Sequence, residues 1–386
     1  MERDEAERRT YCEIRRAPGV TSELRVDGIV LGAGIAGLSA ADALIQKGRS
    51  CVILDPAPPG SGSSSAPGML INPATGRRAK MTWRAEECYH EILNLLQRIQ
   101  KESEETFYEE RGVLRPALTA KLAKDFERSP EKYPWPNGWI EWLPEEKFSD
   151  RFPVFKTRHG GLIVNKGMTV IGDLLIRSFA KYLENKGADL VVGEYSLKND
   201  GKTWIAETKA GKRVHADFVI DATSQHQMES GLWDFLPLHA VKGQTATLHY
   251  DGELPLKSSV SSLGYMAYFS MKPKELTVGS TYEHHFTSLE PDKDGLEYLK
   301  DKLGSTFPTL TESYKDIVQW SGVRVTVPDK KPLIGPHPEK EELYIIGALG
   351  SKGLLMGRYL AGLLTDEILE RKEIDEVVSI RRYLDS

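Results

Sequence analysis

Cysteine is scarce in this sequence and forms no recognisable pattern. Only three occur in 386 residues, at Cys12, Cys51 and Cys88. Their spacings match no metal-binding motif, and the odd number argues against a disulfide framework. We therefore expect no metal site, and we interpret the thiols as structural or incidental groups in a protein of a reducing compartment.

Long apolar runs are also lacking. No uncharged stretch reaches the roughly 18 residues that a membrane-spanning helix requires, and the first 25 residues are too charged for a secretory signal. We expect no contact with a membrane, and the cytoplasm is the expected location.

The chain has no excess of positive charge. Its net charge is -5, so its long-range field weakly repels phosphate, and any contact with RNA would have to be local. Its 386 residues are enough to bury a large core in two or three lobes. No pattern indicates an oligomeric state.

A βαβ unit begins near residue 26. Residues 26–31 have the composition of a buried strand, residues 35–47 that of a helix, and residues 50–55 that of a second strand. Gly32-Ala33-Gly34-Ile35-Ala36-Gly37 matches G-x-G-x-x-G between the first strand and the helix. This context predicts that the helix N-terminus binds the pyrophosphate of a dinucleotide. At the end of the second strand, before Pro56, the Asp55 carboxylate is predicted to accept hydrogen bonds from the adenosine ribose.

The remaining patterns predict an interleaved α/β fold. A Pro-, Gly- and Ser-rich stretch at 56–73 breaks regular structure, and an amphipathic helix from about Arg84 is assigned to a second lobe. Helical periodicity returns at 170–186. Further strands are predicted at 190–192, 218–222, 245–250, 265–270, 276–280 and 343–346, with a final helix at 354–370. The expected architecture is a Rossmann-like domain interleaved with a mostly antiparallel sheet-plus-helix domain.

Two segments far apart in the chain resemble a known family. Gly62–Leu70, read as GSSSAPGML, resembles the loop with which glycine oxidase and its relatives wrap the ribityl chain and flavin ring. The segments 321–335, with SGVR and PDKKPLIG, and 347–354, with GALGSKGL, resemble the carboxyl-terminal signature of the same family. The chain thus resembles FAD-dependent oxidoreductases of the D-amino-acid oxidase family from Val26 to Ile368. Within that family it most resembles the FAD module of bacterial bifunctional tRNA 5-methylaminomethyl-2-thiouridine biosynthesis proteins.

The resemblance implies FAD as cofactor. We expect noncovalent binding, because relatives that attach flavin covalently use a cysteine in the carboxyl-terminal part and none follows Cys88 here. The predicted cofactor-binding residues are Gly32, Gly34, Ile35, Ala36, Gly37, Asp55, Pro56, Ser63, Ser64, Ser65, Gly68, Met69, Leu70, Ala222, Thr223, Arg324, Gly350, Ser351, Lys352, Gly353 and Leu354.

The same resemblance implies hydride transfer from the α-carbon of a small amine or amino acid to flavin N5. Arg324 is the candidate clamp for a substrate carboxylate, with a strand-end salt bridge as its alternative role. Tyr268 falls near the family's active-site tyrosine, with Tyr265 as competitor and plain packing as the alternative. Lys352 is the candidate for a second anion contact. Thr277 stands where N-methyl amino acid oxidases place an oxygen-activating lysine, which puts rapid use of oxygen in doubt.

Two alternative functions remain open. The first is a tRNA-modifying oxidoreductase that removes a carboxymethyl group from a modified wobble uridine, favoured by the basic cluster Arg77, Arg78, Lys80 and Arg84 beside Trp83. The second is a flavin-binding protein without turnover.

The resemblance also implies domain borders. Residues 1–25 are expected to form an N-terminal tail. The FAD-binding domain is expected to comprise 26–90, 161–235 and 321–386, and the substrate domain 91–160 and 236–320.

Overall fold

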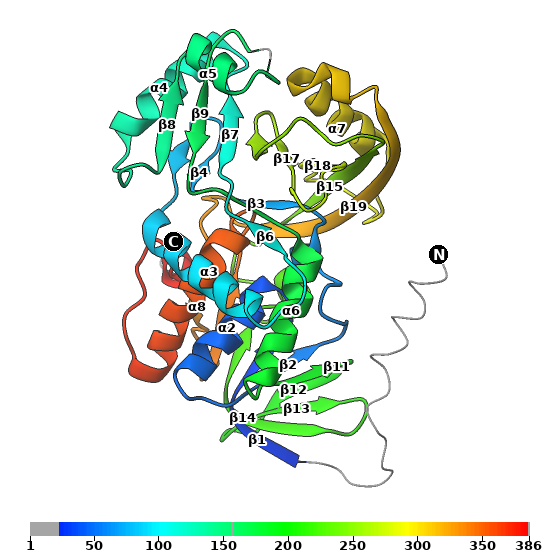
Figure 1. The fold of residues 1–386 in the computed structure, drawn as a ribbon. Helices are drawn as coiled ribbons and strands as arrows, with labels where there is room; N and C mark the ends of the chain where they lie inside the picture. Colours follow the sequence, from blue (N-terminus) through cyan, green and yellow to red (C-terminus); the bar gives the residue numbers. More distant parts are fainter. Residues whose placement is uncertain (1–22, 156, 385–386) are drawn as a thin grey trace.

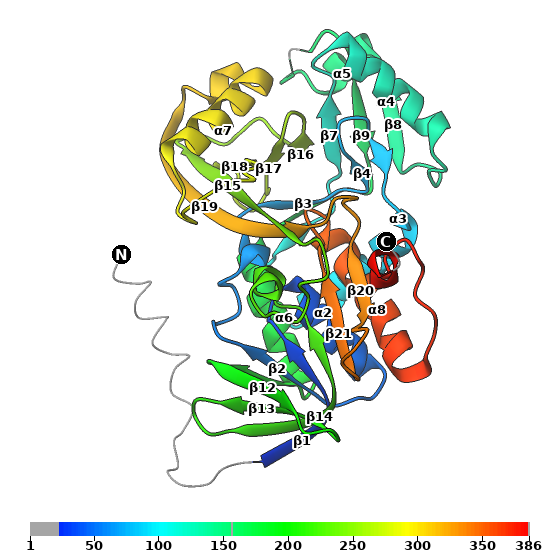
Figure 2. The ribbon, with the colours of Figure 1, turned by 180° about the vertical axis from the view of Figure 1, so that it is seen from behind.

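The computed structural model describes residues 23–155 and 157–384. Residues 1–22, most of the predicted tail, lie outside the described residues, and β1 begins at Glu23, so residues 23–25 belong to a strand. The chain forms two lobes, each built on an eight-stranded sheet. Figures 1 and 2 show one lobe above the other, with strand β3 at their junction. Among the described residues, no helix has the length and apolarity needed to cross a membrane.

The first lobe contains the predicted βαβ unit. Strands β11, β2, β1 and β14 pair in parallel, and the hairpin of β12 and β13 extends the sheet antiparallel. β21 pairs in parallel with the end of β14 and carries β20. The strands are β1 (Glu23–Leu31), β2 (Cys51–Asp55), β11 (Asp189–Val192), β12 (Tyr195–Asn199), β13 (Trp204–Thr208), β14 (Arg213–Asp221), β20 (Leu333–Pro336) and β21 (Leu343–Gly347).

Helices cover one face of this sheet. They are α2 (Ile35–Gln46), α3 (Ala85–Gln100), α6 (Gly172–Asn185) and α8 (Gly353–Glu370). Alternate strand residues point to opposite faces, so Val30 of β1 packs under these helices. Ile29 and Leu31 instead pack on the other face with Trp233 and Ile380. Both faces are buried, which explains the nearly continuous apolar runs of β1 and β2.

The assignment of the helix after Arg84 to the second lobe is wrong. The apolar stripe of α3, which includes Ile92, Leu95 and Ile99, packs into the core of the first lobe. Arg98 of α3 also donates two hydrogen bonds of 2.8 Å to the buried Asp42 of α2. Amphipathic spacing predicted the helix correctly but carried no information on which sheet its apolar face covers.

The second lobe contains the predicted antiparallel sheet. Its strand order is β19-β15-β18-β17-β16-β7-β9-β8, and β16 with β7 is the parallel pair in it. The strands are β7 (Val113–Pro116), β8 (Ile140–Leu143), β9 (Gly161–Val164), β15 (His239–Tyr250), β16 (Ser259–Ser261), β17 (Tyr265–Ala267), β18 (Glu275–Gly279) and β19 (Tyr314–Thr326). The helices are α4 (Ala120–Lys132), α5 (Glu145–Arg151) and α7 (Lys293–Thr306). The proposed border at residue 321 falls inside β19.

Short elements lie between the lobes. β3 (Met69–Ile71), β10 (Met168–Val170) and β6 (Tyr108–Glu109) form a small sheet, and β4 (Ala74–Thr75) with β5 (Lys80–Met81) forms a hairpin. The stretch 56–73, predicted to be irregular, contains β3 and the 3-10 turn η1 (Ser63–Ser65). The other 3-10 turns are η2 (Ser224–Met228), η3 (Pro308–Leu310) and η4 (Ile380–Tyr383).

Candidate active site

The glycine turn has the close approaches that the motif requires. Gly32 has φ +100°, a backbone conformation that residues other than glycine rarely adopt. A Cβ atom on Gly37 would overlap the carbonyl oxygen of Gly32. The turn therefore places the N-terminus of α2 directly at the end of β1, where its free N–H groups attract anionic oxygens.

Asp55 lies at the end of β2, next to this turn. Its carboxylate accepts a 2.7 Å hydrogen bond from the N–H of Ala33 in the glycine turn and one of 2.8 Å from the N–H of Ala57, which follows Pro56. Burial raises the pKa of Asp55 despite these two hydrogen bonds. The carboxylate thus orders the glycine turn, and its contact with a ribose stays a prediction.

The serine-rich loop joins the two lobes. Ser64 Oγ accepts a 3.1 Å hydrogen bond from the Ile35 N–H at the start of α2. Ser63 Oγ donates to the Val323 carbonyl at 2.6 Å and accepts from the Val323 N–H at 2.9 Å. Since Val323 precedes Arg324 on β19, this serine ties the loop at the dinucleotide turn to the sheet of the second lobe.

The end of the loop lies against the second lobe. A Cβ atom on Gly68 would lie 2.8 Å from the Cβ atoms of Ala267 and Thr277, so only glycine fits there. Met69 and Leu70 continue as β3 and pair with Val170 and Thr169 of β10.

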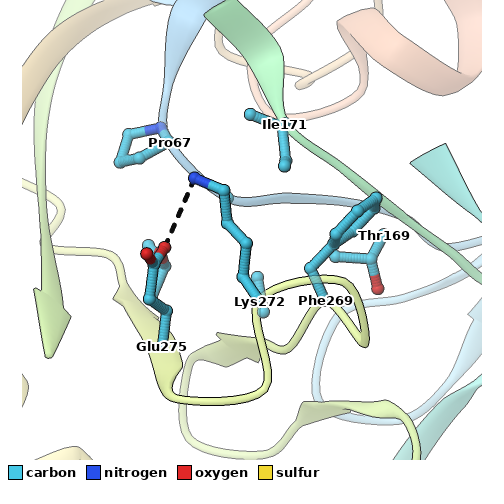
Figure 3. A pocket seen from close by; sticks show the side chains of 9 residues that line it. Pro67, Thr169, Ile171, Phe269, Lys272 and Glu275 are labelled. Carbon is cyan, nitrogen blue, oxygen red and sulfur yellow. Dashed lines mark ion pairs between the residues drawn. The ribbon is translucent and has the colours of Figure 1, made fainter. Parts of the chain in front are cut away.

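Figure 3 shows a small pocket at this junction, with Pro67 and Ile171 on the loop side and Lys272 and Glu275 opposite. These two charged residues form an ion pair of 3.4 Å. The junction of loop and sheet therefore leaves a space with a charged rim.

The carboxyl-terminal turn lies beside the glycine turn. Gly350 has φ +55° and its N–H donates to the Val325 carbonyl at 2.9 Å. A Cβ atom on Gly353, where α8 begins, would lie 3.4 Å from Ile35, so α2 and α8 begin next to each other. Ser351 is exposed and Leu354 is buried. Two helix N-termini therefore contribute positive potential at one place.

The side chain of Lys352 is half-buried and already bonded to the protein backbone. Its Nζ donates a 2.6 Å hydrogen bond to the Lys330 carbonyl, and desolvation lowers its pKa. Its predicted contact with an anion stays untested.

Further predicted cofactor residues lie next to the glycine turn or in the serine-rich loop. Ala222 follows β14, and its carbonyl oxygen is 2.7 Å from the position of a Cβ atom on Gly32, with Thr223 next to it. Ser65 Oγ is buried and has no hydrogen-bond partner among the described residues. Glycine positions that a Cβ would fill and an unpartnered hydroxyl are the features that a bound dinucleotide requires, so the residues fit FAD.

One face of the second sheet points to the serine-rich loop. Thr247, Thr277 and Ala267 are in register across β15, β18 and β17, and Tyr265 lies two pairs further along, on the same face. Arg324 pairs with Val241 of β15, which shares a face with Thr247 because side chains alternate. Arg324, Tyr265 and Thr277 thus lie on the face that contacts Gly68.

Arg324 is held by neutral groups. One guanidinium nitrogen donates to Ser280 Oγ at 2.6 Å, another to the Thr281 carbonyl at 3.4 Å, and the group lies 4.8 Å from the centre of the Tyr282 ring. Among the described residues no carboxylate forms an ion pair with it. Within the described part of the chain, Arg324 therefore does not have the alternative role of a strand-end salt bridge. Some of its five N–H donors stay free to bind an anion.

A buried lysine holds the loop that contacts Arg324. Lys242, whose side chain is 3% exposed, bonds Asp292 at 3.1 Å and pairs with Glu283 at 3.5 Å. Gln244 also donates to both carboxylates. The segment 280–292 is thereby fixed to β15.

The prediction of Tyr268 as an active-site residue disagrees with its position. Tyr268 follows β17 and packs in the core of the second lobe, in the same cluster as Met266. Residues three apart on a strand point to opposite faces, so Tyr265 takes the position facing Arg324. Burial raises the pKa of Tyr265 to about 12, and the charge of Arg324 opposes this rise. We therefore propose Tyr265 in place of Tyr268.

Tyr265→Phe and Tyr268→Phe form a matched pair for testing this assignment. We expect Tyr265→Phe to lower kcat/KM about tenfold, because a hydroxyl that bonds a charged or polarised group contributes ~1.5 kcal/mol. Tyr268→Phe should change kcat/KM less than twofold. Steady-state kinetics on both variants measure this, and the reverse order would restore Tyr268.

Two charged residues near the site were not predicted from the sequence. Lys302 of α7 donates to the Ser280 carbonyl at 2.9 Å, and Arg115 of β7 donates to the carbonyls of Ala74 and Gly76. Both are almost fully buried. The one signal for Lys302 was its place between Leu299 and Leu303 on an apolar face, and no local signal marked Arg115.

Comparison with known proteins decides the family. The family profile described as FAD dependent oxidoreductase matches residues 27–367. The chain belongs to this family. It is therefore an FAD-dependent oxidoreductase, and the predicted cofactor and fold class are confirmed.

Two curated proteins illustrate the relationship. The chain is 26% identical over 362 residues to the tRNA 5-methylaminomethyl-2-thiouridine biosynthesis bifunctional protein MnmC of Thiobacillus denitrificans, covering 88% of this chain and 56% of that protein. It is 25% identical over 369 residues to the uncharacterized oxidoreductase YurR of Bacillus subtilis, covering 90% and 96%. The chain thus spans about half of the MnmC protein and nearly all of YurR.

Solved structures share the fold. Glycine oxidase from Geobacillus kaustophilus superposes with a TM-score of 0.78 at 21% identity, covering 91% of this chain and 96% of that one. L-proline dehydrogenase from P. horikoshii gives 0.77 at 16% identity, covering 92% and 96%. At these identities the likeness shows the fold alone.

Proposed function

We propose that this protein oxidises the C–N bond of a small amine that carries a carboxylate. The observation that carries the proposal is Arg324, which lies on the sheet face beside Gly68 with no carboxylate partner among the described residues. An unpaired guanidinium next to a flavin site suits a substrate carboxylate, which it binds through two parallel hydrogen bonds.

The residues have separate tasks in this reaction. FAD, when bound, supplies the acceptor for the hydride that leaves the substrate carbon. Arg324 binds the carboxylate and so fixes the distance of that carbon from the cofactor. Ser280 and Tyr282 restrict the guanidinium to one orientation. Tyr265 donates its hydroxyl hydrogen bond to the bound substrate.

Anaerobic reduction of the flavin tests this function directly. The holoenzyme is mixed without oxygen with glycine, sarcosine, D-amino acids or proline, and the flavin absorbance is followed. We expect at least one amino acid to bleach the flavin and its N-acetyl derivative to leave it oxidised. A panel of amine-containing acids that all leave the flavin oxidised would remove the proposal.

A tRNA substrate is the second candidate, supported by the likeness to MnmC. Of the basic cluster, Arg78 lies 4.0 Å from Asp125 and Arg84 lies 2.9 Å from Glu87, which leaves less charge for phosphates. Binding of bulk tRNA at two salt concentrations tests this candidate. Binding that weakens as salt rises would favour it, and no binding at low salt would exclude it.

A further inference from the structure

A second unpaired cation lies next to Arg324. Lys302 is 7% exposed, and α7 packs its Leu299 and Leu303 on the sheet face opposite to Arg324. The lysine side chain extends past the end of β18, where its Nζ donates to the Ser280 carbonyl at 2.9 Å and lies 4.3 Å from the centre of the Tyr298 ring. Within 23–155 and 157–384, no carboxylate pairs with it.

Ser280 connects the two cations. Its carbonyl accepts from Lys302 and its hydroxyl accepts from Arg324. Burial, together with the charges of Arg324 and Arg77, lowers the pKa of Lys302 to about 8. Like charges in a partly buried place repel one another, so a bound anion would relieve this repulsion.

Arg77 comes from a hairpin that the fold holds in place. The buried Arg115 donates to the Ala74 carbonyl at 2.7 Å and to the Gly76 carbonyl at 2.6 Å. Ser129 Oγ donates to the Ala79 carbonyl at 2.7 Å. These bonds fix the turn between β4 and β5. Arg77 on this turn is exposed and forms no ion pair with another described residue.

We propose that Arg324, Lys302 and Arg77 form one anion site for an amine substrate with two acidic groups. This inference rests on the proposed function and names its substrate class. Arg324 binds the carboxylate next to the reacting carbon, and the second acidic group lies toward Lys302 and Arg77. Three cations match two carboxylates better than one, and the burial of Lys302 favours a small dicarboxylate over a polymer.

Ligands that cannot be oxidised separate binding from turnover. Thiodiacetate has two carboxylates and (methylthio)acetate has one, and neither carries an amine. Each is titrated into the holoenzyme while the flavin absorbance reports binding. We expect thiodiacetate to bind about tenfold more tightly, the effect of ~1.4 kcal/mol from a second partly exposed ion pair. Equal affinities would overturn the proposal, as would no binding of either ligand.

Lys302→Gln removes the proposed second contact. We expect the Kd of thiodiacetate to rise about tenfold and that of (methylthio)acetate to change less than twofold. Lys300→Gln, on the same helix but paired with Glu297 at 3.1 Å, is the matched control and should change neither. Arg77→Gln is a second variant at an exposed position and should weaken thiodiacetate about threefold. Equal losses for both ligands would indicate a structural role and overturn the proposal.

The pH dependence adds an independent readout. Lys302 is protonated well below its pKa of about 8 and loses its charge above it. The groups around it are the Ser280 carbonyl, Tyr298 of its own helix, Arg324 of β19 and Arg77 of the hairpin, and none of these is a carboxylate. The preference for thiodiacetate should thus be full near pH 6.5 and decline above about pH 8. A preference that is constant from pH 6.5 to 9.5 would count against Lys302.

The proposed function and this inference fail differently. If one-carboxylate amines bleach the flavin and iminodiacetate does so no better, the function stands and the dicarboxylate inference falls. If iminodiacetate and N-(phosphonomethyl)glycine both react faster than N-ethylglycine, the second acidic group is not restricted to a carboxylate. If no amine-containing acid reduces the flavin, the proposed function falls.

Discussion

Arg324→Lys is expected to lower kcat/KM for the amine substrate about a hundredfold, mainly through a higher KM. Lysine keeps the charge but offers no planar pair of donors, and its shorter reach loses the contacts with Ser280 and Tyr282. A hundredfold change corresponds to ~2.8 kcal/mol, in the range of a lost charge-assisted bidentate pair. Steady-state kinetics with the substrate found by flavin bleaching measure the effect.

Two controls give this result its meaning. FAD content should stay at the wild-type level, because the serine-rich loop is held near Arg324 by bonds between Ser63 and the Val323 backbone, which the substitution does not change. Arg213→Lys, at an exposed arginine that pairs with Glu207 at 3.4 Å, should leave kcat/KM unchanged. An unchanged KM in Arg324→Lys would show that the carboxylate binds elsewhere.

The nucleotide-binding end of the fold was predictable because its determinants are local. The glycine turn needs a strand, a tight bend and a helix start within a few residues, and each leaves its own pattern. β1, α2 and β2 therefore lie within three residues of their predicted bounds. The serine-rich loop was recognised by resemblance, but its bond to Val323 joins residues 260 apart and left no local trace.

The substrate side was less predictable because it depends on strand phase and helix placement. Tyr265 and Tyr268 have similar sequence surroundings, and only the register with β18 decides which one faces Arg324. The place of Lys302 on the apolar face of its helix was a signal for burial, but its contact with the Ser280 carbonyl leaves no trace in the sequence. The stripe of α3 indicated a buried face but not that Asp42 and Arg98 fix it to the first lobe.

The proposed anion site would account for the many bonds that fix the segment 280–292 beside Arg324. An unpaired guanidinium near Lys302 is repelled by it, and the neutral contacts from Ser280 and Thr281 offset only part of this cost. The network of Lys242, Gln244 and Asp292 keeps these contacts in place without adding a carboxylate next to Arg324. Acidic residues one layer away would thus preorganise the proposed anion site.

Gly37→Ala is expected to remove FAD from the purified protein. The Cβ atom would overlap the carbonyl oxygen of Gly32, and the backbone of neither residue can move away without opening the turn. Alanine is favoured over glycine inside a helix by ~1 kcal/mol, so helix propensity alone predicts a more stable α2. We expect the overlap to dominate, with FAD content below about a tenth of wild type.

Gly362→Ala separates these two effects because Gly362 is also a helical glycine. A Cβ atom there would lie 3.3 Å from Nη1 of Arg358, the end of a flexible side chain that can shift. This variant should keep its FAD and gain slightly in thermal stability, whereas Gly37→Ala should lose the cofactor. The absorbance ratio of flavin to protein after purification measures the FAD content of both variants, and thermal unfolding measures their stability. A Gly37→Ala protein with wild-type flavin content would mean that the pyrophosphate does not bind at the start of α2.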